Sequence, residues 1–160
     1  MTSQLGYLPK EMKSLANGIQ VATDGTVLYA NPVGFHQALV SAGATTLTAA
    51  QFLNGLVIMD PQGAGSKLNL PTAASIVAAA NGLTVGSSIR LTVINTADGN
   101  EAIDVDPGTG LTFYTNGNVT ASDDIGQNQT AEYLIVFTNV DPGDEAAVIY
   151  TVGRSSATTE

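Results

Sequence analysis

Acidic residues next to turn-forming residues are the first candidates for chemistry in this chain. Asp104 and Asp106 stand one residue apart before a Pro-Gly pair, a spacing found in calcium-binding loops. Such a loop also needs a bidentate glutamate further on, and Thr115 stands at that position. Aspartate beside glycine and proline is ordinary turn chemistry as well. We therefore expect no bound metal, and Asp104 and Asp106 are the candidates to test by calcium titration.

Catalytic groups of other kinds are sparse. His36 is the one histidine, and neither a cysteine nor a G-x-S-x-G motif accompanies it, although a catalytic triad needs a nucleophile, a base and an acid together. A glycosidase pair of carboxylates would need a cleft lined by aromatic residues, and the chain has no tryptophan. The sequences G-A-G at 63–65 and G-T-G at 108–110 are too short for phosphate-binding loops. The sequence thus predicts that the protein is not an enzyme and uses no cofactor.

The composition narrows the possible partners. The 160 residues are 44% hydrophobic and 12% charged, with a formal net charge of −9. The five cationic residues are scattered, whereas nucleic-acid binding requires clustered lysine and arginine. No run near the start resembles a secretory signal, and no apolar run could span a membrane. We therefore expect no direct contact with nucleic acid or membrane and no export by that route.

The elements that would position such groups are mostly strands. Residues 130–152 form two β-rich runs around a D-P-G-D turn, which predicts a hairpin. Side chains alternate along a strand, so Leu134 and Val136 occupy one face of the first run and Tyr133, Ile135 and Phe137 the other. Because both faces are apolar, we expect this strand to be covered on both sides, by a second sheet, a helix or a neighbouring subunit.

Short strands separated by turn signals also occupy most of the chain upstream. A capping box at Thr48 and Gln51 predicts one helical turn, and alanine-rich residues 73–80 predict a short helix. The other predicted strands are residues 19–22, 26–30, 35–40, 56–59, 67–70, 89–95, 102–105, 111–114 and 118–121.

This pattern predicts a mainly β protein: a β-sandwich or jelly-roll-like antiparallel domain, or a barrel, with one or two short helices. We expect an N-terminal arm or small β region at residues 1–45. A β-sandwich domain would follow at 46–153, and a flexible tail at 154–160.

Four blocks of sequence carry a resemblance to a known family. They are L-T-A-A-Q-F-L-N-G-L-V-I-M-D-P-Q-G at 47–63, L-P-T-A-A-S-I-V-A-A at 70–79, I-R-L-T-V-I-N-T-A at 89–97 and F-T-N-V-D-P-G-D-E-A-A-V-I-Y at 137–150. Together they resemble β-rich domains on the virion surface of tailed bacteriophages. The nearest family is the capsid decoration, or cement, proteins; related domains occur in head-fibre and appendage proteins.

The resemblance implies a mechanical function. A decoration protein is made in the host cytoplasm and sits as a homotrimer on the outer capsid surface of the virion. There it clamps neighbouring subunits of the major capsid protein, its partner, against the pressure of the internal DNA. Neither catalysis nor a cofactor is implied.

Site residues follow from this expectation. The trimer interface would use the C-terminal hairpin, through Tyr133, Ile135, Phe137 and Ile149. Capsid binding would use aromatic, apolar and basic anchors of the N-terminal arm, namely Tyr7, Leu8, Lys10, Met12 and Lys13. The alternative is a module that binds host glycans or a receptor, in which Tyr114 is the best-placed aromatic residue.

Overall fold

The computed structural model describes residues 13–14, 19–21, 27–30, 37–41, 43–62, 66–80, 82–115 and 118–155. The chain divides into two units, Met1–Val33 and Gly34–Glu160. This division falls earlier than the expected one after residue 45. Strands β4 (Gln37–Ser41) and β5 (Ala44–Thr46) therefore belong to the second unit.

The first unit contains a small antiparallel sheet. Its strands are β1 (Lys13–Ser14), β2 (Ile19–Val21) and β3 (Val27–Ala30), and β2 lies between the other two. Strands β2 and β3, which correspond to the predicted strands at 19–22 and 26–30, pair antiparallel.

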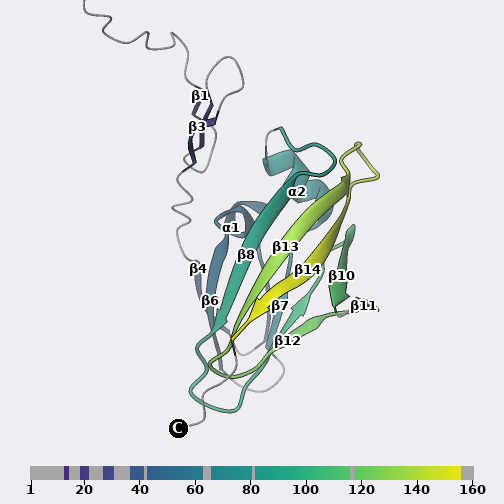
Figure 1. The fold of residues 1–160 in the computed structure, drawn as a ribbon. Helices are drawn as coiled ribbons and strands as arrows, with labels where there is room; N and C mark the ends of the chain where they lie inside the picture. The colour runs from purple at the N-terminus through teal and green to yellow at the C-terminus, as the bar shows by residue number, and fades with distance from the viewer. Residues whose placement is uncertain are drawn as a thin grey trace, which may run out of the picture. The chain divides into compact units, whose positions relative to one another are not determined.

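The second unit contains two mixed sheets. The larger has seven strands in the order β11-β10-β14-β13-β8-β6-β4, and the smaller has four in the order β12-β9-β7-β5 (Figure 1). Their remaining strands are β6 (Leu56–Pro61), β7 (Ser66–Asn69), β8 (Ser88–Asn95), β9 (Ile103–Asp106), β10 (Leu111–Thr115), β11 (Asn118–Thr120), β12 (Asp123–Ile125), β13 (Thr130–Asn139) and β14 (Ala146–Arg154).

The first half of this unit winds between the two sheets. The chain passes from β4 to β5, through helix α1 (Ala49–Leu53) to β6 and β7, and through helix α2 (Ala73–Ala79) to β8 and β9. Each strand thus lies beside the strand one winding earlier and runs parallel to it. The expectation of an antiparallel domain is therefore wrong here. It holds for β8, β13 and β14, which pair antiparallel.

Both helices begin at a capping threonine. Thr48 caps α1 with its side chain and forms the predicted capping box with Gln51, while Thr72 caps α2. Helices this short are marginal in water, so packing must stabilise them. Phe52 of α1 and Ile76 of α2 supply that packing, since both are fully buried.

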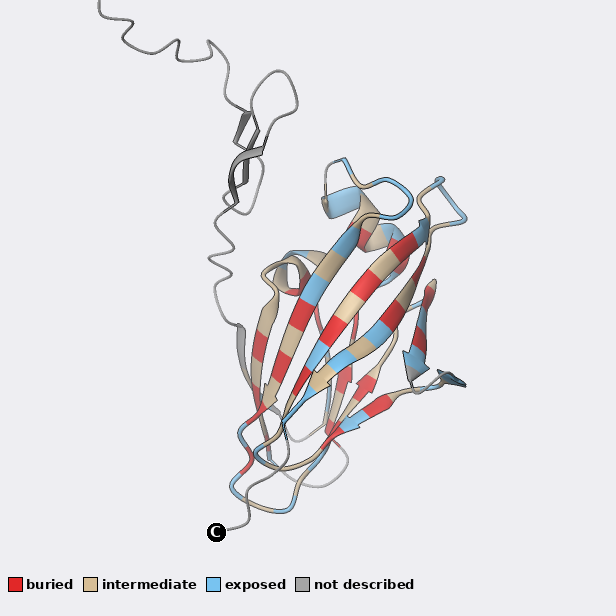
Figure 2. Ribbon diagram, viewed as in Figure 1, coloured by how far each residue is buried: buried red, intermediate tan, exposed pale blue. Residues whose placement is uncertain are grey.

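One hydrophobic core takes alternate side chains from strands of both sheets. Figure 2 shows the alternation as red bands along the strands. The larger sheet contributes Phe113 and Tyr133, whose rings meet edge to face with centroids 5.6 Å apart. The smaller sheet contributes Leu68, Ile103 and Val105. Each strand therefore presents its other side chains outward, and these form the surfaces on which function can act.

The C-terminal hairpin forms as predicted, with β13 and β14 paired antiparallel around the D-P-G-D turn. Gly143 in this turn has a φ of +95°. Gly110, just before β10, has a φ of +82°, and its carbonyl oxygen accepts a hydrogen bond from the backbone N–H of Ala147 at 2.9 Å. A Cβ at Gly110 would lie 2.5 Å from the carbonyl oxygen of Glu145 and 2.8 Å from the Cβ of Ala73. A Cβ at Gly143 would meet nothing within 4 Å.

These two glycines form a matched pair for testing the fold. We expect Gly143→Ala to lower the free energy of unfolding by about 1 kcal/mol, because only the left-handed backbone opposes a side chain there. Gly110→Ala should cost roughly 1–3 kcal/mol more, because the added methyl group also collides with backbone. Urea denaturation of both variants measures the difference. Equal losses would contradict the close approach of Gly110 to Glu145.

Candidate functional site

An uncharged apolar surface covers part of the outward face of the seven-stranded sheet. It spans β11, β10, β14 and β13, where outward positions are expected to be polar if they face water. Three of its members are among the most exposed large hydrophobic residues described: Val119 at 68%, Tyr114 at 40% and Tyr150 at 38%. The other members are half-buried. We define this outer apolar patch as Tyr114, Val119, Leu134, Val136, Val148 and Tyr150.

Strand register aligns the patch into two rows. Tyr114 pairs with Val119 on one side and with Tyr150 on the other, and Tyr150 pairs with Leu134. The rings of Tyr114 and Tyr150 meet edge to face, with centroids 5.8 Å apart. The second row runs through Val148 and Val136. Rigid aromatic side chains beside aliphatic ones provide contact area at little cost in conformational entropy, as in protein interfaces.

Arg90 closes the first row. It pairs with Leu134 across β8 and β13 and is exposed. Arg90 forms no ion pair within the part of the chain that the structure describes. The patch therefore has a cation at its rim that is available to an acidic group of a partner.

The residues expected at the trimer interface lie on the opposite face of the same strands. Tyr133, Ile135, Phe137 and Ile149 are each 0% exposed and belong to the core of the unit itself. Because the four-stranded sheet shares that core, these side chains have no surface to offer a second copy. The sequence showed two apolar faces on this strand but not which one the chain covers, and the face left open is the outer apolar patch.

The expected capsid anchors lie almost wholly outside the described residues. This applies to Tyr7, Leu8, Lys10 and Met12, and also to His36. Lys13 begins strand β1.

The two metal candidates face a lysine. Lys67 on β7 places its Nζ 2.9 Å from Oδ2 of Asp104 and 2.8 Å from Oδ2 of Asp106, both on β9. Burial acts to raise the pKa of Asp104, but the hydrogen bond and charge of Lys67, together with hydrogen bonds with Ser122 and Asp124, hold that pKa below its usual range. Among the described residues, no group of three or more metal-ligating side chains gathers. The two carboxylates are thus arranged around a cation that the chain supplies.

A second ionic cluster reaches from the surface to a buried carboxylate. Asp123 of β12 is 7% exposed, and its Oδ2 accepts hydrogen bonds from the hydroxyl of Tyr133 at 2.9 Å and of Thr151 at 3.2 Å. Arg154 forms an ion pair with the same carboxylate and donates to the carbonyl oxygen of Asp124. Burial raises the pKa of Tyr133, and the charge of Asp123 adds to the effect. The cluster ties β12 of one sheet to β13 and β14 of the other.

A shift in strand register directs Arg154 to this cluster. On β13, Tyr133 pairs with Thr151 of β14, but the residue before it, Glu132, pairs with Gly153. Val152 is therefore an extra residue on β14, which forms a β-bulge. Beyond the bulge Arg154 pairs with Ala131, which is buried. The position of Arg154 differs from expectation, because this residue ends β14 and is not part of a flexible tail. Residues 156–160 of that tail lie outside the described residues.

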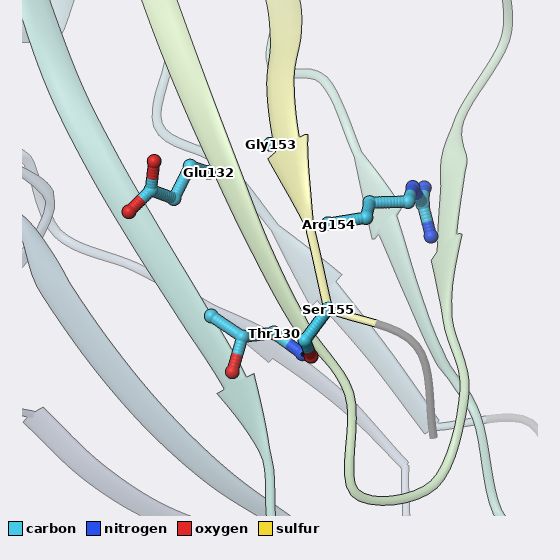
Figure 3. A pocket seen from close by; sticks show the side chains of 5 residues that line it. All are labelled: Thr130, Glu132, Gly153, Arg154 and Ser155. Atoms are coloured by element: carbon cyan, nitrogen blue, oxygen red, sulfur yellow. Dashed lines mark hydrogen bonds between the residues drawn. The ribbon is translucent and has the colours of Figure 1, made fainter. Parts of the chain in front are cut away.

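A shallow recess lies where β13 begins and β14 ends. Its volume is about 290 Å³, and it is lined by Thr130, Glu132, Gly153, Arg154 and Ser155. Figure 3 shows Glu132 and Arg154 extending to opposite sides of the two strands. The backbone N–H of Thr130 donates to Oγ of Ser155 at 2.8 Å. Because its two charged residues point apart, the recess does not bring an acid and a base together on one ligand.

No helix in the described residues is both long and apolar enough to cross a membrane. Comparison with protein-family models, with curated proteins and with solved structures finds no match to this chain. Its function must therefore be inferred from the surfaces described above.

The buried cluster predicts a cost for removing one hydroxyl group. Tyr133→Phe keeps the ring in the core but removes a hydrogen bond to a charged carboxylate, which is worth about 1.5–3 kcal/mol. We expect the free energy of unfolding in urea to fall by that amount. Tyr150→Phe, on the exposed face, is the matched control and should change stability little. A similar effect of both substitutions would contradict the role of Asp123 as a buried acceptor.

The Lys67 cluster predicts a dependence of stability on pH. The folded-state pKa of Asp104 is lowered, so its contribution is complete above the unfolded value of 3.8 and is lost as pH falls through the folded value. In Lys67→Met the main attraction that lowers this pKa is gone. We expect the variant to be less stable near neutral pH and to lose less stability on acidification. Lys67→Arg, which keeps the charge, should resemble the parent protein; an acid limb unchanged in Lys67→Met would refute the assignment.

Proposed function

We propose that this protein is a structural virion protein, a homotrimeric capsid decoration protein that binds the outer surface of the major capsid shell and stabilises the head. The observation that carries the proposal is the outer apolar patch. An acidic, sparingly charged chain presents aromatic and aliphatic side chains outward on its largest sheet. Such a surface favours binding to another protein. The four sequence blocks that resemble decoration proteins supply the identity of the assembly.

We propose that the second unit is a β-sandwich. Both sheets contribute to one core, as two packed sheets do. Its parallel pairs make it a wound sandwich, in contrast to a jelly roll, whose strands pair antiparallel. A sandwich stiffened by a buried ionic cluster suits a passive brace, which must transmit force without deforming.

In this proposal the first unit, Met1–Val33, grips the capsid. Its anchors would be Tyr7, Leu8, Lys10, Met12 and Lys13. Lys10 and Lys13 are two of only five cations in the chain, so they are suited to acidic groups on the major capsid protein. In a trimer, each bound N-terminal unit keeps the others near their targets, which strengthens binding to the capsid.

The proposal predicts saturable binding to capsids. Expanded heads that lack the protein should carry it into the pellet on centrifugation, with a fixed number of copies per head at saturation. Heads already decorated are the control and should bind no more. A protein that stays in the supernatant with undecorated heads would overturn the proposed function.

A second candidate function is the binding of host glycans by a head-fibre or appendage domain. The exposed edge-to-face pair of Tyr114 and Tyr150 favours it, because sugars stack on aromatic faces. A glycan array distinguishes the two functions. Binding that is lost in Tyr114→Ala would favour the glycan-binding module, whereas an empty array with saturable capsid binding would favour decoration.

A further inference from the structure

We propose that the outer apolar patch receives a second copy of this chain, with Arg90 of one copy meeting the acidic loop between β13 and β14 of the next. That loop, here called the hairpin loop, comprises residues 140–145 and contains Asp141, Asp144 and Glu145. The inference rests on the proposed function, since it names the contact that would hold the proposed trimer together.

The patch is where two acidic copies can approach each other. Each copy has a formal net charge of −9, so copies repel over most of their surfaces. All six residues of the patch are uncharged. Tyrosine is enriched among the residues that dominate binding energy, and Tyr114 and Tyr150 stand beside each other within the patch. Burying this surface removes apolar area from water without bringing carboxylates together.

The charge at the rim of the patch indicates which partner binds there. The second unit has three cations, and two of them are engaged: Lys67 by Asp104 and Asp106, and Arg154 by Asp123. Arg90, at the rim of the patch, has no ion-pair partner among the described residues. A partner therefore needs an apolar surface beside exposed carboxylates.

A second copy supplies such carboxylates. Asp141 and Asp144 are exposed at the tip of the same hairpin that carries the patch, and neither forms an ion pair within the described chain. Arg90 cannot reach the loop of its own copy. It lies level with Leu134, and the five steps along the strand from Leu134 to Asn139 span about 17 Å.

The two halves of the contact lie on different parts of one copy. A copy that offers its patch and Arg90 to one neighbour can offer its hairpin loop to another. Contacts of this head-to-tail kind close into a ring when each copy is rotated by the right angle, and a rotation of about 120° would give the proposed trimer.

Charge reversal tests the contact in the full-length protein, with mass measured by light scattering over a dilution series. We expect the parent protein to be a trimer. Arg90→Glu alone and Asp144→Arg alone should each raise the apparent dissociation constant about tenfold or more. The double variant, with both charges reversed, should recover much of the loss. Failure of the double variant to recover would overturn the contact between Arg90 and the hairpin loop.

The apolar part of the contact is tested with a matched pair of substitutions. Tyr150→Glu places a charge within the patch, and Val40→Glu places one at a 72% exposed position on β4, the far edge strand of the same sheet. We expect only Tyr150→Glu to dissociate the trimer. The urea midpoint and far-ultraviolet circular dichroism of Tyr150→Glu verify that it folds. If it does not fold, Val148→Thr provides a milder variant, because it adds a hydroxyl group to the patch but no charge. A trimer unaffected by the folded patch variants would overturn the inference.

Capsid binding by the same variants separates this inference from the proposed function. A parent trimer that persists in every patch variant and still binds heads leaves the function standing and refutes the inference. Trimeric patch variants that no longer bind heads would show that the patch contacts the capsid, which also refutes it. A monomeric parent protein refutes both the inference and the trimeric state in the proposed function, and absence of head binding would refute capsid decoration as well.

Discussion

Each strand of the two sheets can direct only every second side chain into the shared core, and this constraint governs the rest of the structure. On β13 the inward positions hold Tyr133, Ile135 and Phe137, and these are fully buried. The sequence nevertheless places Leu134 and Val136 on the outward positions. Apolar side chains in excess of what the core accepts remain at the surface. The outer apolar patch is the direct result of that excess.

Cations are few in the second unit, and most of them form ion pairs within it. Of the cations in the second unit, Lys67 stabilises a pair of strands on the polar face of the smaller sheet, and Arg154 neutralises a carboxylate inside the core. A buried carboxylate without partners would be strongly destabilising, and Asp123 has three side-chain partners. Arg90 is left at the edge of the patch. Arg90 is thus the cation of the second unit that is left for the surface, because the other two form ion pairs within the unit.

Local signals were enough to predict much of the fold. The capping box at Thr48 and the D-P-G-D hairpin depend on residues that are neighbours in sequence, and both are present. The parallel winding was not predictable in that way, because turn signals do not specify the sheet that the next strand joins. Lys67 and Asp104 meet across 37 residues, and no pattern at either position announces the other. For the site, the alternation showed two apolar faces on β13, but only the position of the smaller sheet decides which one is open.

The extra residue in β14 has a consequence for how the end of the chain is fastened. In a strand paired without interruption, Arg154 would fall on the same side as Tyr150 and Val152 and would extend into water. Val152 interrupts the pairing, so the guanidinium instead turns toward Asp123 in the neighbouring sheet. One inserted amino acid therefore allows a cation that would otherwise face water to form an ion pair between two layers. Insertions or deletions between Tyr150 and Arg154 would break this ion pair even if Arg154 and Asp123 were unchanged.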